Sequence, residues 1–551
     1  MSENLPQRRL SFLGIFIKKN MNNISDDYLK IGKASDLRNR KERIIYRFFE
    51  IFPGGLTWLV IFTVVFLSWK KPAWISIFII FFVIYWLFRT IYLSFHLRSG
   101  YRKMKEQEKI DWLEKLNRLE LKKIPSSSPS LSLRESSVID WRNIYHLVIF
   151  PMYREPLEIV RESFRALEKS DFPKNRMIVV LACEERVRRQ METVPDEIKK
   201  EFGDKFFKLL ITWHPAGLPG EIPGHGSNDA WASREAKEKI IDPLNVPYRN
   251  IIVSSFDADT RVFPKYFGCL TWHYLTVKDP ERTSYQPIPL YLNNIWQAPL
   301  FSQVFAFSST FWHTMNQERP EKLITFSSHS ISFKAMVEVG FKQTNVVSDD
   351  SRIFWQCFLK YDGDYKVEPL YYPVSMDANV AKSFFKTAIN IYKQQRRWAY
   401  GVGEISYFLF GFLKNKKIPI GKKFSLGFEL IEGHLSWAVA SILIFLLGWL
   451  PLILGGPEFS QTLLSYNLPK ITSWILTFSM LGLISSVYLS FILLPPKPLQ
   501  YGKWKYLVFA FTWLLFPFMM IFFSSFPAID AQTRWMLGKY MGFWPTEKFR
   551  K

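Results

Sequence analysis

Five apolar runs, each about as long as a membrane-crossing helix, bracket a polar central region of this chain. Two precede the polar region, at residues 51–69 and 73–95, and three follow it, at 435–454, 472–494 and 506–526. A helix needs about 20 mostly apolar residues to cross the hydrocarbon core of a bilayer. The sequence therefore predicts a multi-pass membrane protein with its polar domain between the spans.

The composition agrees with this division. Of the 551 residues, 48% are hydrophobic and 22% are charged, which alternating apolar blocks and a polar domain explain better than a uniform globule does. The formal charge is +23, and the basic residues cluster beside the apolar runs. This arrangement favours a lipid bilayer as the partner and argues against nucleic acid. Three cysteines are too few for a disulfide framework and suit a reducing compartment, and no cleavable signal peptide is expected.

The basic residues also predict which side of the membrane each segment faces. They flank the first two runs at 38–47 and 98–105, which places both ends of that hairpin, and the polar domain, in the cytosol. The predicted location is the cell membrane. Five spans would leave the C-terminus outside, whereas the basic tail from residue 528 favours the inside. One segment is therefore a candidate for a re-entrant or interfacial element, and the number of spans stays open.

From about residue 143 the pattern changes to short apolar runs that alternate with amphipathic helical patterns. Strands are expected at 144–150, 177–182, 208–213 and 250–256, with helices at 155–170 and 230–241. This alternation predicts an α/β domain with a mostly parallel sheet, in which ligands bind at the carboxyl ends of the strands. The expected domains are a basic segment (1–48), a transmembrane hairpin (49–97), a charged helix and linker (98–142), the α/β domain (143–382), amphipathic interface helices (383–430), C-terminal transmembrane helices (431–527) and a basic tail (528–551).

Asp257-Ala258-Asp259 directly follows the strand expected at 250–256, which would place two carboxylates at the carboxyl end of that strand. Mg²⁺ and similar hard ions take oxygen ligands, usually one or two carboxylates together with substrate phosphates. Asp257 and Asp259 are therefore candidate metal ligands. Carboxylates also commonly end strands in solvated loops, so the triplet alone does not decide between the two interpretations.

Two further motifs each allow two interpretations. Ser348-Asp349-Asp350 opens a helix expected at 351–359, either as an N-cap with acids that complement the helix dipole or as the source of a general base. Residues 394–398, Gln-Gln-Arg-Arg-Trp, lie in a basic amphipathic region. They fit an interfacial helix that contacts lipid headgroups. They also fit an Arg that braces a pyrophosphate and a Trp that stacks beneath a sugar.

Taken together, in this order and between membrane spans, the three motifs resemble those of the glycosyltransferase family 2 membrane synthases, the group that contains cellulose synthase and hyaluronan synthase. The resemblance covers about residues 143–400 and the flanking spans, and its most specific part is 394–398. It implies a Rossmann-like GT-A fold and metal-assisted binding of a nucleotide-sugar, with a UDP-sugar favoured and Mg²⁺ or Mn²⁺ as the cofactor. The residues that it implies are Asp350 as the catalytic base with Asp349 beside it, the metal ligands Asp257 and Asp259, and Gln394, Arg397 and Trp398 at the acceptor end of the nucleotide-sugar site.

Weaker segments extend the resemblance. Residues 150–155 resemble the family's Pro-X-Tyr-Asn-Glu motif, with Arg154 in place of Asn, which implies that Tyr153 and Glu155 line the nucleoside pocket. Ordinary capping of the turn after a strand is the competing interpretation. Glu184 stands where the family often has Asp-Asp-Gly-Ser, and it would accept a hydrogen bond from the base.

Four other residues are candidates for the same site. His225 stands where the family usually has a Lys in a Gly-rich segment that lies against the nucleotide. Trp296, Ser328 and His329 are candidates for the acceptor side, and a packing role is as strongly expected for Trp296.

The resemblance predicts a membrane-bound inverting glycosyltransferase that transfers a sugar from a nucleotide-sugar to a growing polysaccharide or other glycan, with coupled translocation of the product. One alternative is the transfer of a single sugar to a polyprenyl-phosphate or other lipid acceptor. Another is a non-enzymatic scaffold or transporter subunit of an envelope-assembly complex. The last three apolar runs contain almost no ionisable residues, which disfavours a dedicated ion pathway.

Overall fold

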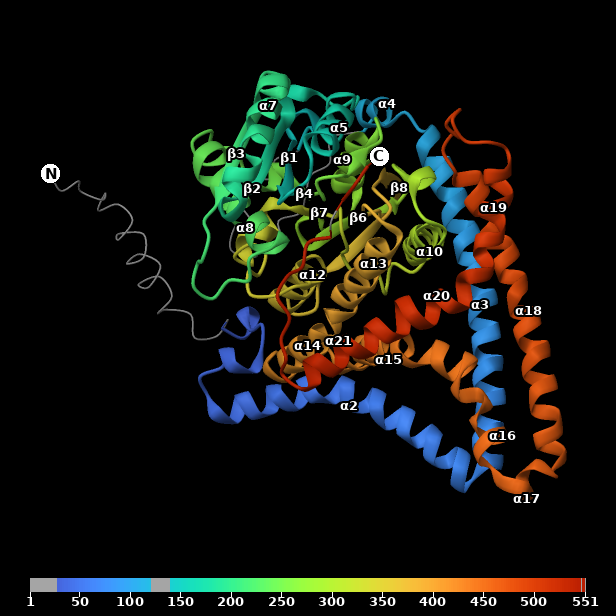
Figure 1. The fold of residues 1–551 in the computed structure, drawn as a ribbon. Coiled ribbons are helices and arrows are strands. Elements are labelled where there is room, and N and C mark those ends of the chain that lie inside the picture. Colours follow the sequence, from blue (N-terminus) through green and yellow to red (C-terminus); the bar gives the residue numbers. More distant parts are fainter. Residues whose placement is uncertain (1–26, 120–138, 547, 551) are drawn as a thin grey trace.

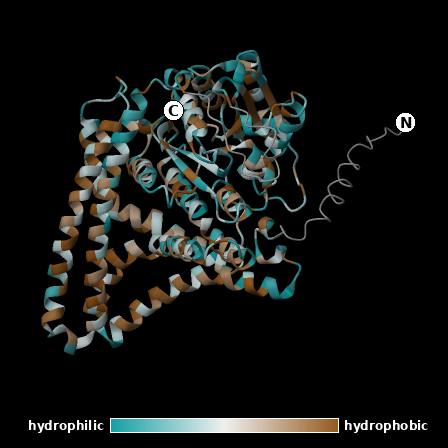
Figure 2. Ribbon diagram, turned by 180° about the vertical axis from the view of Figure 1, so that it is seen from behind, coloured by the Kyte–Doolittle hydropathy of each residue, from teal (hydrophilic) through white to brown (hydrophobic). Residues whose placement is uncertain are grey.

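The computed structural model describes residues 27–119, 139–546 and 548–550. An α/β domain lies against a set of long helices, some beneath the domain and some rising along one side of it (Figure 1). In chain order the domain follows α3 and precedes α15. The long helices are the hydrophobic part of the molecule, whereas the domain mixes polar and apolar residues (Figure 2).

Five segments of the described residues are long and apolar enough to cross a membrane: Arg40–Lys70 (α2), Pro72–Lys109 (α3), Ile420–Phe445 (α15), Leu463–Leu493 (α18) and Trp504–Met536. Large apolar side chains on them face outward, including Trp74, which is 75% exposed, and Phe81, which is 67% exposed. Exposed apolar surface of this extent is typical of contact with lipid. The structure thus supports a membrane protein.

The later segments differ in their bounds from the apolar runs of the sequence. The run at 435–454 is split, because α15 begins at Ile420 and ends at Phe445, and a short helix, Leu450–Leu454 (α16), follows. The last segment is broken into Trp504–Thr512 (α19), Phe516–Met520 (α20) and Phe526–Met536 (α21). Pro517 and Pro527 stand near the starts of α20 and α21. Proline removes a backbone donor and clashes with the preceding turn, so the helix bends at these points.

The domain contains an eight-stranded sheet in the order β3-β2-β1-β4-β7-β6-β8-β5. The bounds are Tyr145–Met152 (β1), Met177–Glu184 (β2), Lys208–His214 (β3), Ile251–Ser255 (β4), Arg261–Val262 (β5), Thr283–Leu290 (β6), Ser330–Ser332 (β7) and Lys366–Ser375 (β8). The four strands expected from the sequence are β1 to β4, and they pair in parallel.

The other half of the sheet corrects the expectation of a mostly parallel arrangement. Strand β7 runs antiparallel to both β4 and β6, and β5 runs antiparallel to β8, while β6 and β8 are parallel. The sheet is therefore mixed. A strand of two or three residues is too short to show any alternation of apolar residues, so β5 and β7 leave no pattern from which their direction could be predicted.

Helices cover both faces of the parallel half, which explains why its strands read as continuous apolar runs. Successive residues of β1 point to opposite faces: Leu147 belongs to the same buried cluster as Ala232 of His225–Ala236 (α8), and Val148 to that of Phe164 of Leu157–Glu168 (α5). The other helices of the domain are Arg188–Met191 (α6), Thr193–Phe202 (α7), Tyr266–Thr276 (α9), Leu300–Gln317 (α10), Phe333–Glu338 (α11) and Asp349–Lys360 (α12), and Trp112–Asn117 (α4) precedes its first strand.

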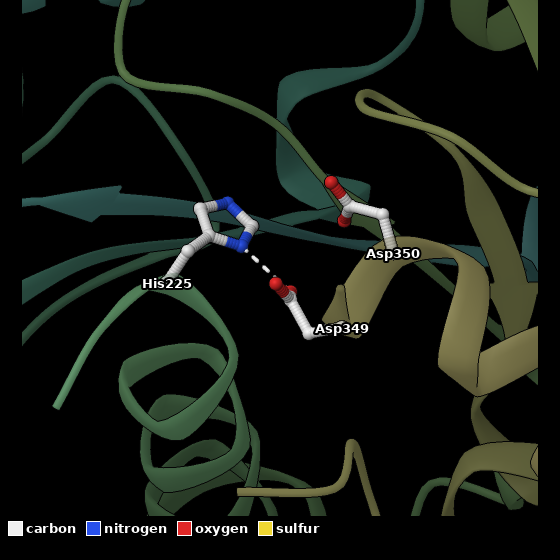
Figure 3. A group of neighbouring side chains, drawn as sticks. All are labelled: His225, Asp349 and Asp350. Atoms are coloured by element: carbon white, nitrogen blue, oxygen red, sulfur yellow. Dashed lines mark hydrogen bonds and ion pairs between the residues drawn. The ribbon is translucent and has the colours of Figure 1, made fainter. Parts of the chain in front are cut away.

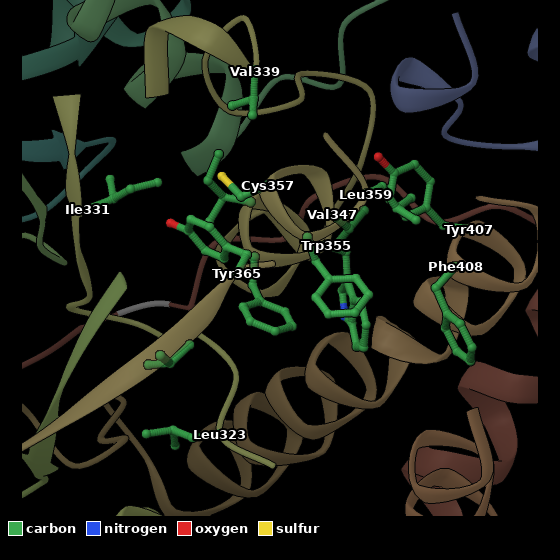
Figure 4. Close-up of a cluster of buried hydrophobic side chains, with 14 of the residues drawn as sticks. Leu323, Ile331, Val339, Val347, Trp355, Cys357, Leu359, Tyr365, Tyr407 and Phe408 are labelled. Carbon is green, nitrogen blue, oxygen red and sulfur yellow. The ribbon is translucent and has the colours of Figure 1, made fainter. Parts of the chain in front are cut away.

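A hydrophobic cluster joins α12 of the domain to the helix that follows the domain's last strand and α13 (Phe384–Ala399) in the chain (Figure 4). Trp355 of α12 stacks on Phe408 of Gly403–Lys414 (α14), with ring centroids 5.3 Å apart. Helix α14 in turn packs against α2. Because α12 begins at Asp349, this packing fixes the position of the two acids at its start.

Candidate functional site

The acidic motifs meet where β4, α8 and α12 come together. Asp257 follows the end of β4, His225 opens α8, and Asp349 and Asp350 open α12. Figure 3 shows the ring of His225 turned toward Asp349, and Asp350 follows Asp349 at the start of the same helix. His225 Nδ1 lies 2.8 Å from Asp349 Oδ2, and its Nε2 lies 3.6 Å from Asp257 Oδ1. The imidazole thus bridges two motifs that are far apart in the sequence.

Ser348 is the N-cap residue of α12, and Asp349 and Asp350 lie in its first turn, where the helix dipole favours negative charge. The Ser348 hydroxyl makes no cap hydrogen bond and instead donates to Glu404 Oε1 at 2.6 Å. Asp349 and Asp350 both accept from the ammonium of Lys342, at 3.1 and 3.0 Å. The acids therefore have partners beyond the helix end, and both interpretations of this motif remain predictions.

The charges of this cluster shift its pKa values in opposite directions. Burial alone would lower the pKa of His225, but the adjacent Asp349 carboxylate raises it to about 9. Burial would raise the pKa of Asp350, but Lys342 and His225 hold it below its ordinary value. At neutral pH the imidazole is therefore cationic and the Asp350 carboxylate is ionised.

Residues His225, Asp349 and Asp350 bring three atoms of metal-ligand type within 4.8 Å of one another. The ammonium of Lys342 already contacts both carboxylates, and the cationic His225 contacts Asp349. Because these cations compensate the negative charge, the cluster fits an acid–base site better than a second metal site.

Asp257 and Asp259 face a different cation. Asp257 Oδ2 accepts from Ser327 Oγ at 2.8 Å, and Asp259 Oδ2 accepts from the backbone N–H of Asp377 at 3.0 Å. The other carboxylate oxygen of Asp259 pairs with the ammonium of Lys548. Burial and the charges of Asp377 and Asp257 raise the pKa of Asp259 to about 6, although the Lys548 ammonium acts to lower it.

The residues around Asp259 provide ligands and charge for a divalent ion. Asp257 and Asp259 both follow β4, the charges of Asp257 and Asp377 act on Asp259, and the Lys548 ammonium already occupies a cation position against it. Carboxylate oxygens are the ligands that Mg²⁺ and Mn²⁺ prefer. The residues present therefore fit the metal that the sequence implies.

The described part of the C-terminal tail, residues 539–546 and 548–550, lies along this site. The Phe543 ring lies 4.7 Å from the guanidinium of Arg397 and is so close to Gly224 that an added Cβ there would meet it at 2.5 Å. Farther along, the Arg550 guanidinium pairs with Asp377 at 2.6 Å and with Glu162 at 2.6 Å. The tail thus contacts the carboxylates on which a donor and its metal would bind.

The helix Phe384–Ala399 (α13) carries the residues of the Gln-X-X-Arg-Trp motif. Gln394 Oε1 accepts from Asn379 Nδ2 at 3.1 Å, and the Trp398 ring lies 6.1 Å from that of Phe305. Within the described residues the buried Nε of Arg397 has no hydrogen-bond partner. Gln394 and Trp398 line a cavity together with Tyr291, Ser302, Phe305, Ala306, Ser309, Asp377, Ala378 and Asn379.

The residues expected at the nucleoside end lie around the carboxyl ends of β1 and β2. Glu155 Oε2 accepts from the backbone N–H of Tyr153 at 2.7 Å, so this carboxylate caps its own turn. Glu184 is only 3% exposed, and its Oε2 lies 3.2 Å from Arg186 and 3.5 Å from His214. The buried Glu184 Oε1 has no hydrogen-bond partner within the described residues, which leaves an acceptor for a ligand N–H.

The remaining candidates for the acceptor side differ in what their side chains contact. Trp296 donates to the carbonyl of Pro495 at 3.0 Å and packs against Tyr506, which is a packing role. His329 is buried, and its Nδ1 lies 3.7 Å from Asp350 Oδ1. Ser328 shares a hydrogen bond with Thr260 at 3.1 Å.

Sequence reasoning missed Lys342, Asp229, Asp377 and Lys548. None of them belongs to a recognisable motif, and Lys548 lies 289 positions from Asp259, with which it pairs.

Comparison with known proteins adds little to this geometry. No family model and no curated protein matches the chain. Among solved structures, it is similar to the mannosyltransferase PcManGT from Pyrobaculum calidifontis in complex with GDP-Man and Mn²⁺, at 14% identity and a TM-score of 0.37, over 75% of this chain and 99% of that chain.

It is also similar to S. aureus TarS 1–349 in complex with UDP-GlcNAc, at 10% identity and a TM-score of 0.32, over 72% of this chain and 93% of that chain. A third similar structure is GalNAc-T7 with UDP, GalNAc and Mn²⁺, at 11% identity and a TM-score of 0.29, over 54% and 57% of the two chains. At these TM-scores the likeness assigns no activity to this chain.

Proposed function

We propose that this chain is a membrane-bound, metal-dependent inverting glycosyltransferase of the family 2 type, which transfers sugar from a nucleotide-sugar to a growing glycan. The observation that carries the proposal is the bridge from Asp257 through His225 to Asp349, which brings a carboxylate pair at a strand end close to the acids that open α12. A donor diphosphate and an acceptor hydroxyl need these two groups side by side.

In this proposal Asp257 and Asp259 hold Mg²⁺ or Mn²⁺ together with the donor diphosphate. A bound divalent ion supplies charge stabilisation to the diphosphate leaving group. The Arg397 guanidinium, with its unpartnered Nε, lies close enough to Asp257 and Asp350 to interact with their charges, and it would bind phosphate oxygens. Glu184 Oε1 would accept a hydrogen bond from the base.

Asp350 acts as the general base. Its carboxylate takes the proton of an acceptor hydroxyl as that oxygen attacks the anomeric carbon, and the bond from that carbon to the diphosphate breaks. Because Lys342 and His225 hold the pKa of Asp350 below its ordinary value, the carboxylate is ionised at neutral pH, as a general base must be. In this proposal Gln394 and Trp398 of α13 contact an acceptor sugar on the other side of the reacting carbon.

Replacement of Asp350 by Asn tests the assignment of the base. We expect sugar transfer to fall by about 10²–10⁴-fold, while the affinity for the nucleotide changes little. The matched control is Asp364→Asn, because the Asp364 side chain is 67% exposed and pairs only with Arg282 among the interactions of the described residues. Turnover at the wild-type rate in Asp350→Asn would show that another group takes the proton.

The acceptor is tested by product size. Five apolar segments beside the α/β domain support a polymer that is extended and passed through the membrane. Incubation with radiolabelled nucleotide-sugars, UDP-sugars first, should give a ladder of lengths. A single-sugar lipid product would instead establish transfer to a polyprenyl-phosphate or other lipid.

A further inference from the structure

Lys342 is a fully buried lysine at the centre of the acidic cluster. It lies in the loop between α11 and α12, and its side chain is 0% exposed. Its Nζ lies 3.1 Å from Asp229 Oδ2, 3.1 Å from Asp349 Oδ2 and 3.0 Å from Asp350 Oδ1. A buried ammonium is costly unless it is paired and hydrogen-bonded, so three carboxylates around one lysine form a highly constrained arrangement.

The lysine is also anchored by the carboxylate of Asp229. Asp229 belongs to α8, is itself fully buried, and accepts hydrogen bonds from Ser233 and from Ser255 at the end of β4. The hydroxyl of Ser255 also accepts from Lys342 Nζ at 3.0 Å. Lys342 therefore joins three elements, β4, α8 and the start of α12.

Exposure distinguishes the three carboxylates around Lys342. The Asp229 side chain is 0% exposed and that of Asp349 is 5% exposed, whereas that of Asp350 is 27% exposed. Asp350 is therefore the carboxylate that an acceptor can reach.

The contacts of Asp350 distinguish its two oxygens. Lys342 and His329 both lie against Oδ1, and within the described residues no hydrogen bond reaches Oδ2. The charged or titratable groups that act on this carboxylate come from every element around it: Lys342, Asp349, His225, His329, Asp257 and Arg397. Lys342 is the one that hydrogen-bonds to it.

We propose that Lys342 is a positioning residue for sugar transfer: it holds Asp350 through Oδ1, with Asp229 as the anchor, and so presents Oδ2 to the acceptor hydroxyl. This inference rests on the function proposed above. Lys342 does not touch the substrate in this role. The alternative is that Lys342 only neutralises Asp229 and has no influence on the reaction.

The double variant Asp229→Asn/Lys342→Met separates these roles. It removes one negative and one positive charge, so the net charge of the cluster is unchanged, whereas Lys342→Met alone would leave three buried carboxylates with too little compensation. We expect kcat to fall about 10- to 100-fold because the base loses its fixed position, while the KM for the donor stays at the wild-type value. A wild-type kcat, or a change confined to the donor KM, would overturn the proposal.

Lys342→Arg is the second variant, and it decides the case if the double variant does not fold. It keeps the positive charge but moves the hydrogen-bond donors, since a guanidinium is longer and planar. We expect a reduced kcat with an unchanged donor KM, and a wild-type kcat would show that charge alone suffices and overturn the positioning role.

Lys103→Met/Glu318→Gln is the matched control, because it likewise removes one positive and one negative charge, from an ion pair between α3 and the end of α10 whose side chains are 38% and 10% exposed. It should lower the melting temperature and leave kcat near the wild-type value. The Asp350→Asn variant distinguishes the two hypotheses. If Asp350→Asn is inactive and the Lys342 variants have wild-type kcat, only the positioning inference fails. If Asp350→Asn is fully active, the proposed base itself is wrong.

Discussion

At the scale of single residues, the two acids of Asp257-Ala258-Asp259 differ in their environments. Lys548, His225 and the Ser327 hydroxyl outweigh burial and hold the pKa of Asp257 below its ordinary value. Asp259, next to Asp377 and Asp257, has its pKa raised to about 6. An excess of negative charge at Asp259 is what a divalent ion would neutralise.

Asp257→Asn removes one of the two proposed metal ligands. We expect the concentration of Mn²⁺ needed for half-maximal nucleotide binding to rise by more than about tenfold. Loss of a group that only hydrogen-bonds to a metal ligand already lowers metal affinity by about that factor, and Asp257 is proposed as a ligand itself. Nucleotide binding with increasing Mn²⁺ measures this, with the exposed Asp364→Asn as the control. Equal Mn²⁺ dependence in Asp257→Asn and wild type would remove Asp257 from the metal site.

His214 gives a prediction about pH. Burial would lower its pKa, but hydrogen bonds to Glu184 and Glu221 raise it from 6.5 to about 9. The stabilisation from the protonated imidazole is therefore fully present below pH 6.5 and is lost as the pH rises to about 9. Melting temperatures of the wild type should fall across this window, and those of His214→Asn should fall less. Parallel curves for the two proteins would contradict the assignment.

At the scale of elements, the close approach of α8 and α12 forms the acid–base site. A Cβ at Gly226 would lie 2.5 Å from the Cβ of Asp349, so only glycine permits this contact. The sequence contained the glycine and the acids, but 122 positions separate Gly226 from Ser348, and no local pattern predicts their contact.

Gly226→Ala should separate the two helix ends. We expect a loss of about 1–3 kcal/mol in stability from overpacking, together with a lower transfer rate because Asp349 and Asp350 move. The control is Gly421→Ala in α15, where nothing lies within 4 Å of the added Cβ. Thermal unfolding and transfer assays of both variants provide the measurement, and indistinguishable variants would show that α12 shifts freely.

The tail is the second element that the site depends on. Because Lys548 pairs with Asp259 and Arg550 with Asp377, a donor with its metal must compete with these cations. Lys548→Ala/Arg550→Ala should lower the KM for the metal-bound donor by about fivefold. This factor corresponds to ~1 kcal/mol of binding free energy that the donor no longer spends on displacing the two cations. Donor titrations of variant and wild type test this; a raised KM would mean instead that the tail helps to bind the diphosphate.

At the scale of the whole molecule, the fifth apolar segment does not run straight through the bundle. Its last part, α21, packs against α2 and α13, and the tail after it contacts the α/β domain. Arg47, near the start of α2, donates to the carbonyls of Trp535 and Met536. The C-terminus therefore lies on the side of the domain, which agrees with the basic tail and favours the re-entrant or interfacial alternative.

Single cysteines test this topology. The α2–α3 link at Lys71 lies at the end of the bundle away from the domain, whereas the α18–α19 loop at Lys497 lies at the end near α4 (Figure 1). The three native cysteines are buried and give little background. In intact cells a membrane-impermeant maleimide should label Lys71→Cys and not Lys497→Cys, and the reverse would invert the predicted orientation.

The sequence by itself determined the apolar segments, strands β1 to β4 and the acids that follow β4, because segment length, apolar periodicity and strand ends are local properties of the chain. Only the tertiary structure decided the direction of β7, the fold-back of the last apolar segment, and the meeting of Asp350 with Lys342, Asp229 and His225. These depend on contacts between residues far apart in sequence, whose energies come from burial and charge pairing that no local pattern encodes.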